Sequence, residues 1–136
     1  MALVILTGFY NAEKYIERCL FTIKNQDYSD FTCYITHDLS TDNSVALVKK
    51  FIEKDSRFVL VDDNDKKLYQ AGNFDKGIRH NPNISDEDVI IEVDGDDYLP
   101  DSKVFNRIHS LYSDKNVWIA NGSFTYSNGQ LGFSSK

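Results

Sequence analysis

Short apolar runs alternate along this chain with longer segments in which apolar residues recur every three or four positions. The runs occupy residues 3–6, 31–36, 58–61 and 89–93, and the periodic segments cover residues 11–25, 45–52, 68–79 and 100–111. Such runs are typical of buried strands, and such segments are typical of amphipathic helices. Strands that alternate with helices pair in parallel through right-handed crossovers. The alternation therefore predicts an α/β fold, a three-layer sandwich with a mostly parallel central sheet.

Local signals refine this outline at three places. Asn11 is a candidate N-cap of the first helix, because its side chain can accept a hydrogen bond from a free backbone N–H group. Residues 117–120 and 124–126 are predicted to form two further short strands. The Asn128-Gly129 pair that follows predicts a hairpin turn, since this pair tolerates positive φ values. The length of 136 residues suits a single domain over residues 1–136.

The fourth apolar run leads directly into a cluster of acidic residues. Asp94, Asp96 and Asp97 follow the run, and Gly95 between them predicts a tight bend or a close backbone approach. In open α/β sheets, ligands collect outside the carboxyl ends of the strands. A divalent cation would remove the repulsion between these carboxylates and prefers oxygen ligands. The residues alone leave two interpretations open, which are metal or phosphate-ester chemistry and a solvated acidic turn.

The loops after the first two strands are expected at the same edge of the sheet. Phe9 and Tyr10 follow the first strand, and Asp38 follows the second. An aromatic ring can stack on a flat base, and a carboxylate can accept a hydrogen bond from a base N–H or a ribose hydroxyl. Together with the acidic cluster, these residues suit a nucleotide diphosphate. The alternatives are core packing for the two aromatic residues and a cap of the following helix for Asp38.

Composition and charge exclude several classes of protein. The chain is 41% hydrophobic and 26% charged, which is typical of a globular protein, and its net charge of -6 argues against broad nucleic-acid binding. Cys19 and Cys33 lie at apolar positions and are predicted to be buried thiols rather than zinc ligands or a disulfide. The apolar residues 2–6 are too few for a signal peptide or a membrane span. We therefore expect no membrane span and a cytoplasmic location, which includes the cytoplasmic face of a membrane.

Three motifs of the chain resemble those of the family-2 glycosyltransferases of the GT-A fold. The chain has Gly-Phe-Tyr-Asn at 8–11, His-Asp-Leu-Ser-Thr-Asp at 37–42 and Asp-Gly-Asp-Asp at 94–97. The family has Pro-x-Tyr-Asn, Asp-Asp-Gly-Ser-Thr-Asp and Asp-x-Asp-Asp. Each motif is weak by itself, but three in the right order, each after a predicted strand, are fairly specific. The resemblance covers about residues 3–110.

The resemblance implies a reaction and a set of site residues. Members of the family transfer a sugar from a nucleotide-diphosphate sugar, here by analogy a UDP-sugar, usually with inversion and a divalent metal (Mn²⁺ or Mg²⁺). The acceptor, a glycan, lipid or protein, is not identified by the sequence. Asp38 would contact the base or ribose, Asp94 the ribose or sugar, and Asp96 the metal beside the diphosphate. The implied nucleotide-sugar-binding residues are Gly8, Phe9, Tyr10, Asp38, Asn73, Asp94 and Gly95, and the implied metal ligands are Asp96 and Asp94.

The chain departs from the family pattern at several positions. Gly8 replaces the proline of the first motif, and His37 replaces the first acid of the second motif, which leaves Asp38 to act alone. Residues 70–73 resemble the family's Ala-Arg-Asn stretch, which approaches the donor, but Gly72 stands where arginine is common. The resemblance then leaves a phosphate or sugar contact to Lys76 or Arg79.

No catalytic base is evident in the sequence. Inverting transfer needs a carboxylate that deprotonates the acceptor hydroxyl, and the family places it well beyond the metal motif. Asp101 and Asp114 fit helix ends better than this role. We therefore expect a donor-binding part of a longer enzyme. Two other interpretations stay open, a phosphoryl-transfer hydrolase with Asp94 as nucleophile and Asp96 as acid, and a non-catalytic nucleotide-sugar-binding module.

Overall fold

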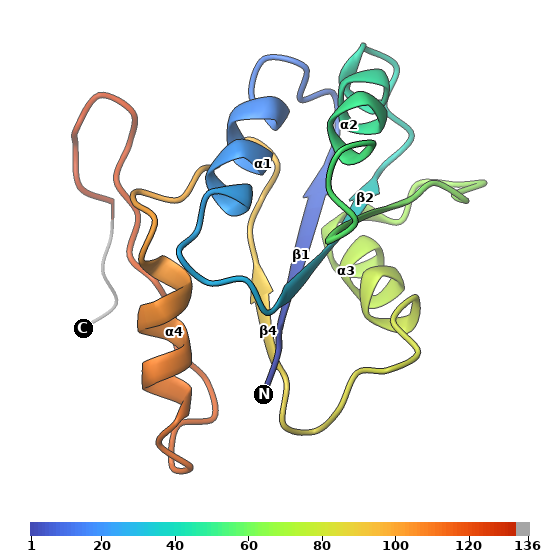
Figure 1. The fold of residues 1–136 in the computed structure, drawn as a ribbon. Coiled ribbons are helices and arrows are strands. Elements are labelled where there is room, and N and C mark those ends of the chain that lie inside the picture. Colours follow the sequence, from blue (N-terminus) through green and yellow to red (C-terminus); the bar gives the residue numbers. More distant parts are fainter. Residues whose placement is uncertain (133–136) are drawn as a thin grey trace.

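The structure, a computed structural model, describes residues 1–132 and contains one parallel four-stranded sheet. The order of the strands across the sheet is β3-β2-β1-β4. Apolar and β-branched runs form all four strands, as predicted. The strands are β1 (Leu3–Phe9), β2 (Phe31–His37), β3 (Phe58–Val61) and β4 (Val89–Glu92), shown in Figure 1.

Helices cover both faces of the sheet (Figure 1). Three of them, α1 (Ile16–Lys24), α2 (Ser44–Ile52) and α4 (Val104–Tyr112), belong to the layer on one face, and α3 (Tyr69–Arg79) covers the other. Side chains of β1 alternate between the two cores, with Leu3 and Ile5 on the side of α1 and Val4 and Leu6 on the side of α3. All four are buried, as expected for a central strand of a parallel sheet. The predicted three-layer sandwich is confirmed.

Strand β1 is longer than the apolar run from which it was predicted. It pairs with β2 over its whole length, from Leu3 opposite Phe31 to Phe9 opposite His37. The predicted loop residues 7–9 therefore belong to the strand, because β2 supplies backbone partners for them. Strand β4 pairs with only the first four residues of β1, Leu3 to Leu6. The two strands that flank β1 thus end at different heights.

Strand β4 is the outer strand at one edge of the sheet. Ile90 is 40% exposed and Glu92 is exposed, so β4 is not covered on both faces as its apolar sequence suggests. A groove of about 420 Å³ lies beside it, next to α3. The residues that line this groove are Gln70, Ala71, Phe74, Asp75, Ile78 and Glu92.

Two other local predictions are wrong. Helix α1 begins at Ile16 rather than after Asn11, and Asn11 has a φ of 47° while its Oδ1 accepts a hydrogen bond from the N–H of Thr41 at 2.8 Å. Residues 117–120 form no strand, and Trp118 is 87% exposed. Apolar, β-branched sequence needs a neighbouring strand to form a ladder, and residues 1–132 supply none there.

The predicted strand 124–126 is reduced to a single bridge between Thr125 and Leu131. The turn between them does form, with the Gly129 N–H donating to the Tyr126 carbonyl at 2.8 Å. Only Gly129 adopts a positive φ, 85°, in this turn. One isolated bridge is the smallest unit of strand pairing, so the predicted strand is present only as this minimal hairpin.

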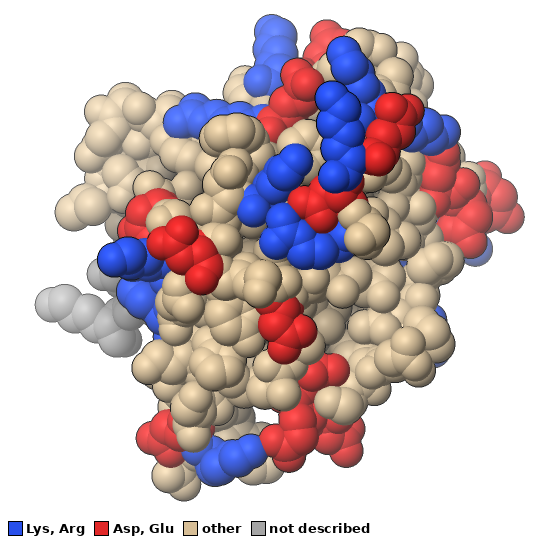
Figure 2. Space-filling view, viewed as in Figure 1, with Lys and Arg blue, Asp and Glu red and all other residues tan. Residues whose placement is uncertain are grey.

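Both cysteines are buried and free, as predicted. Burial raises the pKa of the Cys33 thiol to about 12, and burial also raises the pKa of Cys19. Neither thiol is therefore reactive at neutral pH. Within residues 1–132, no helix has the length and apolar character that crossing a bilayer requires. Figure 2 shows acidic and basic side chains mixed over the face in view, where no broad basic surface appears.

Candidate functional site

The carboxyl ends of β1, β2 and β4 are held together by backbone hydrogen bonds. The N–H of Asp38 donates to the Phe9 carbonyl at 3.0 Å, and the N–H of Gly95 donates to the Gly8 carbonyl at 2.9 Å. These bonds place the loops after the three strands side by side. The residues that the sequence assigns to one site therefore do lie at one edge of the sheet.

Gly95 is needed because the fourth loop passes directly over β1. A Cβ atom at this position would lie 2.6 Å from Phe9 Cβ and 3.1 Å from both the Gly8 oxygen and Ile16 Cδ1. Real Cβ atoms essentially never approach a backbone-anchored carbon so closely, and two of these neighbours cannot move without shifting β1. The predicted close backbone approach is confirmed.

Gly95→Ala should therefore destabilise the fold by about 1–3 kcal/mol, the usual cost of overpacking. The matched control is Gly122→Ala, where a Cβ would meet nothing within 4 Å. Its effect should stay within about 0.5 kcal/mol, as at other exposed sites. Urea unfolding of the three proteins measures both values. Equal stability of Gly95→Ala and the parent would show that the loop relaxes without cost and that its packing on β1 is loose.

The two aromatic residues of the first loop differ in their surroundings. Phe9 is 7% exposed and stacks on His37, with 5.7 Å between ring centroids, so core packing accounts for it. Tyr10 is 50% exposed, and the Lys67 Nζ lies 4.1 Å from the centroid of its ring. Of the two rings, only that of Tyr10 is open to a ligand. Gly8 comes just before these two residues, and a Cβ atom at this position would lie 3.4 Å from Phe74 Cε1.

Asp38 holds the start of α3, the helix beyond the one that sequence reasoning considered. Its Oδ1 accepts hydrogen bonds from the N–H of Leu68 at 2.7 Å, the N–H of Tyr69 at 3.2 Å and Asn73 Nδ2 at 3.3 Å. Partial burial acts to raise the pKa of Asp38, but these three bonds outweigh it and hold the pKa below its usual range. No residue among 1–132 bonds to Oδ2, which leaves this oxygen to a ligand.

The backbone of Tyr69 gives this cap additional importance. Tyr69 has a φ of 57°, a left-handed conformation that residues other than glycine adopt at some cost. The bond from its N–H to Asp38 helps to hold that conformation. The side chain of Tyr69 is 74% exposed.

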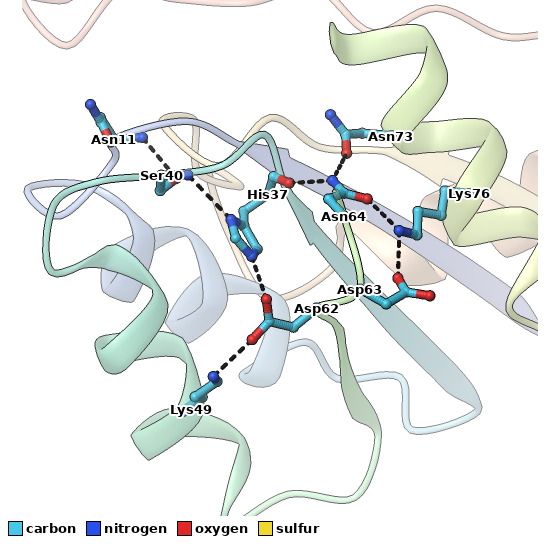
Figure 3. A network of polar contacts seen from close by, with 9 residues as sticks. All are labelled: Asn11, His37, Ser40, Lys49, Asp62, Asp63, Asn64, Asn73 and Lys76. Carbon is cyan, nitrogen blue, oxygen red and sulfur yellow. Dashed lines mark hydrogen bonds and ion pairs between the residues drawn. The ribbon is translucent and has the colours of Figure 1, made fainter. Parts of the chain in front are cut away.

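Asn73 lies behind Asp38 and contacts protein groups on every side. It is 3% exposed, and its Nδ2 also donates to the Tyr69 carbonyl at 2.8 Å. Its Oδ1 accepts from Asn64 Nδ2 at 3.1 Å, and Asn64 in turn donates to the His37 carbonyl at 2.7 Å (Figure 3). Through these bonds Asn73 orients the side chain of Asp38. Its burial leaves little surface for a direct contact with a ligand.

His37 is part of the same network, through its carbonyl and through both nitrogens of its ring. Its Nδ1 accepts from the Ser40 N–H at 3.3 Å, so Nε2 is the protonated nitrogen and donates to Asp62 Oδ1 at 2.7 Å. Asp62 also pairs with Lys49 at 2.8 Å (Figure 3). A hydrogen bond from Lys49, followed by one from His37, holds the pKa of Asp62 below its usual range. The histidine that replaces an acid here thus has a structural role.

These lowered pKa values predict acid sensitivity. Aspartates in unfolded chains have pKa values near 3.9, and Asp38 and Asp62 have lower values in the fold. Their stabilisation is therefore complete above about pH 4 and is lost as the pH falls through the lowered values. Urea unfolding at pH 7, 5 and 3 should show the loss between pH 5 and 3. Asp62→Asn should reduce that loss, whereas the exposed control Asp65→Asn should keep it, and equal slopes in all three proteins would contradict this origin.

The acidic cluster follows β4 in a turn, with the Asp97 N–H donating to the Asp94 carbonyl at 2.9 Å. Asp94 Oδ1 accepts from Gln70 Nε2 at 2.9 Å, while the side chains of Asp96 and Asp97 are exposed. Partial burial, and then the charges of Asp96 and Asp94, raise the pKa of Asp97. The part of this shift that comes from Asp96 and Asp94 reflects repulsion among the three carboxylates. The start of α3 thus contacts two loops. Asp38 of the loop after β2 caps it, and Gln70 on its first turn donates to Asp94 of the loop after β4.

The carboxylates suit a metal that is bound together with a ligand. Within residues 1–132, no three His, Cys, Asp or Glu side chains are arranged to enclose a metal ion. One or two exposed carboxylates, however, are the usual ligands of a hard cation that retains waters and binds phosphate oxygens. The chemistry of Asp94 and Asp96 fits such a cation, and its charge would relieve the repulsion that, after burial, contributes to the raised pKa of Asp97.

The two basic residues considered as substitutes for an arginine at Gly72 lie elsewhere. Lys76 contacts Asn64 and pairs with Asp63 at 2.5 Å. Arg79 pairs with Asp75 at the opposite end of α3, about 15 Å from Tyr69 at a rise of 1.5 Å per residue. Lys67, which the sequence interpretation did not single out, is the basic residue beside Tyr10. Its position depends on the path of the loop after β3, which no local pattern predicts.

Asp101 and Asp114 lie at helix ends, as predicted. Asp101 accepts from the Lys103 N–H at 2.8 Å before α4 and contacts Arg107 at 3.0 Å. Asp114 accepts from the Asn116 N–H at 3.0 Å after α4. Neither carboxylate lies in the turn that carries Asp94 and Asp96.

The chain is similar to known proteins in sequence and in fold. The family model described as "Glycosyl transferase family 2" matches residues 4–134. The chain belongs to glycosyl transferase family 2. Among curated relatives, the teichoic acid poly(glycerol phosphate) polymerase of Staphylococcus epidermidis is 36% identical over 104 residues, which cover 71% of this chain and 13% of the polymerase. The putative glycosyltransferase EpsH of Bacillus subtilis is 30% identical over 98 residues, 72% of this chain and 27% of EpsH.

Two solved structures share the GT-A fold with this family-2 chain. Mannosyltransferase PcManGT from Pyrobaculum calidifontis, in complex with GDP-Man and Mn²⁺, has a TM-score of 0.74 at 21% identity and is matched over 33% of its length. S. aureus TarS 1–349, in complex with UDP-GlcNAc, has a TM-score of 0.71 at 18% identity and is matched over 32%. Each match covers 85% of this chain. The chain thus spans a third or less of each of these four proteins.

Proposed function

We propose that this chain is the donor-binding domain of a metal-dependent, inverting glycosyltransferase that uses a nucleoside-diphosphate sugar, with UDP as the nucleotide. The observation that carries the proposal is the convergence of three loops at the carboxyl edge of β1, β2 and β4. They bring an exposed aromatic ring, a carboxylate with an open oxygen and an acidic turn to one place. The family membership, and the nucleotide sugars in the TarS and PcManGT complexes, support the same assignment.

Each group has a task in this proposal. The ring of Tyr10 stacks on the base, and Asp38 Oδ2 accepts a hydrogen bond from an N–H group of the base. Asp94, oriented by Gln70, faces the ribose or sugar, and Asp96 holds the metal with Asp94 as second ligand. When bound, Mn²⁺ or Mg²⁺ neutralises the diphosphate as it becomes the leaving group. The Mn²⁺ in the PcManGT complex supports this choice of cation.

The catalytic base and the acceptor site are assigned to parts of the protein outside the donor site. An inverting transfer requires a carboxylate beside the acceptor hydroxyl. Asp101 and Asp114 accept backbone hydrogen bonds at the two ends of α4, so we do not propose either of them as the catalytic base. The acceptor itself, a glycan, a lipid or a protein, stays unassigned. The greater length of the relatives leaves room for these parts.

Calorimetric titration of the full chain with UDP tests the proposal. Binding should be strong with manganese and weak in EDTA, because the carboxylates repel an uncompensated diphosphate. Release of inorganic phosphate from sugar phosphates would instead support the hydrolase interpretation. Equal binding of UDP in manganese and EDTA would contradict the metal site, and failure to bind any nucleoside diphosphate would contradict the donor site altogether.

A further inference from the structure

Lys67 lies where the proposed base site meets the start of α3. Its Nζ is 4.1 Å from the centroid of the exposed Tyr10 ring, and it immediately precedes Leu68, whose N–H donates to Asp38. In the part of the chain that the structure describes, Lys67 takes part in no ion pair. An exposed contact between a cation and a ring is weak, and the lysine stem is flexible. Its ammonium group is therefore available to a ligand that stacks on Tyr10.

Asp38 offers an acceptor at the same place. Its Oδ1 is occupied by three donors of α3, whereas Oδ2 bonds to no residue between 1 and 132. Lys67 is held near this carboxylate by the chain, because the N–H of the next residue, Leu68, donates to Asp38 Oδ1 at 2.7 Å. The loops that carry Tyr10, Asp38 and Lys67 thus bring an aromatic ring, an ionised acceptor and a cationic donor together, with the ammonium over the face of the ring.

Two backbone donors at the start of α3 already have a partner. A helix N-terminus commonly offers free N–H groups to a ligand. Here the N–H groups of Leu68 and Tyr69 both donate to Asp38. The two basic residues of α3 are paired with acidic residues, Lys76 with Asp63 and Arg79 with Asp75. Lys67, by contrast, forms no ion pair within residues 1–132 and is a donor open to a ligand.

An acceptor beside a donor distinguishes two classes of nucleobase. Uracil and guanine present a ring N–H next to a carbonyl oxygen, which complements a carboxylate beside an ammonium. Cytosine and adenine present an unprotonated ring nitrogen next to an amino group, which places acceptor against acceptor and donor against donor. Stacking on Tyr10 does not discriminate, because every base has a flat face.

We infer that Lys67 is a specificity-determining residue of the proposed donor site. Its ammonium donates to a carbonyl oxygen of the base while Asp38 Oδ2 accepts from the adjacent ring N–H, so the site selects keto bases over amino bases. The inference rests on the proposed function and names the class of base that the site takes.

Calorimetric titration of the full chain with UDP and CDP in manganese tests the inference, because these ligands share the diphosphate and ribose. The parent should bind UDP at least about fivefold more tightly than CDP, the discrimination expected of a good base contact. Lys67→Ala should reduce the ratio of UDP to CDP affinity by weakening UDP binding more than CDP binding, and the preference that remains is the part that Asp38 supplies. Lys67→Arg keeps an N–H donor and should retain most of the preference.

The control is Lys66→Ala, which removes the same charge from the exposed neighbour and should preserve the preference. If Lys67→Ala weakens UDP and CDP by the same factor, Lys67 contacts the phosphates or only the ring, and the inference is overturned. The same holds if the parent binds UDP and CDP equally. If the parent binds no nucleoside diphosphate, the proposed function fails and the inference fails with it.

Discussion

Replacing Asp96 with asparagine should abolish the gain in UDP affinity that manganese gives the parent chain. The parent is expected to lose about tenfold or more in affinity when EDTA replaces manganese, since charge-assisted contacts contribute about 1.5–3 kcal/mol. Asp96→Asn keeps the shape of the exposed side chain and removes the charge that holds the cation. Its affinity for UDP should be the same with manganese and with EDTA.

The same substitution should leave the fold intact. The Asp96 side chain is exposed, and removing its charge relieves the repulsion that helps to raise the pKa of Asp97. The thermal midpoint of Asp96→Asn should therefore equal or slightly exceed that of the parent. Asp86→Asn, an exposed change on the loop before β4, is the matched control and should retain the full response to manganese. A variant of Asp96 that still responds like the parent would show that the acidic turn holds no metal.

Asp38→Ala should weaken UDP binding by about 1–3 kcal/mol and destabilise the fold by a comparable amount. The first effect follows from losing the acceptor Oδ2 that the base would use. The second follows from losing Oδ1, which accepts from Leu68, Tyr69 and Asn73. These bonds cap α3 and hold the left-handed backbone of Tyr69. Calorimetry with UDP and urea unfolding measure the two effects on the same protein.

Asp38→Asn separates the two roles. An amide oxygen can still accept the hydrogen bonds that start α3, so most of the stability should return. The amide NH₂ would then stand where a base N–H points, donor against donor, so UDP binding should remain as weak as in Asp38→Ala. An asparagine variant that binds UDP like the parent while the alanine variant is merely unstable would reduce Asp38 to a helix cap.

The sheet could be predicted from the sequence because its strands are apolar runs separated by helical periodicity. The convergence of the three loops followed from the same reasoning, since parallel strands end at one edge. The close approach of Gly95 to Phe9 could also be anticipated, because a glycine at a strand end commonly marks a tight bend or a close backbone contact. These features depend on local sequence and on general rules of topology.

Other features depend on contacts between residues far apart in the sequence. Asp38 caps α3 from a loop 30 residues earlier, and Gln70 bonds to Asp94 from 24 residues away. No periodicity reveals such pairs. Residues 117–120 have the composition of a strand, but a strand also requires a neighbour, which local sequence does not contain. Lys67 could not be singled out from the sequence, because its role depends on where the loop after β3 places it.

Strand β4 leaves its outer row of backbone N–H and C=O groups without a strand partner among residues 1–132. Such an edge is a template for another strand, whether from the same protein or from a second molecule. The half-exposed Ile90 and the groove beside α3 add apolar surface along it. An added β-strand at this edge is a route to aggregation in solution, and the exposed acidic Glu92 at the end of β4 opposes such growth by charge repulsion.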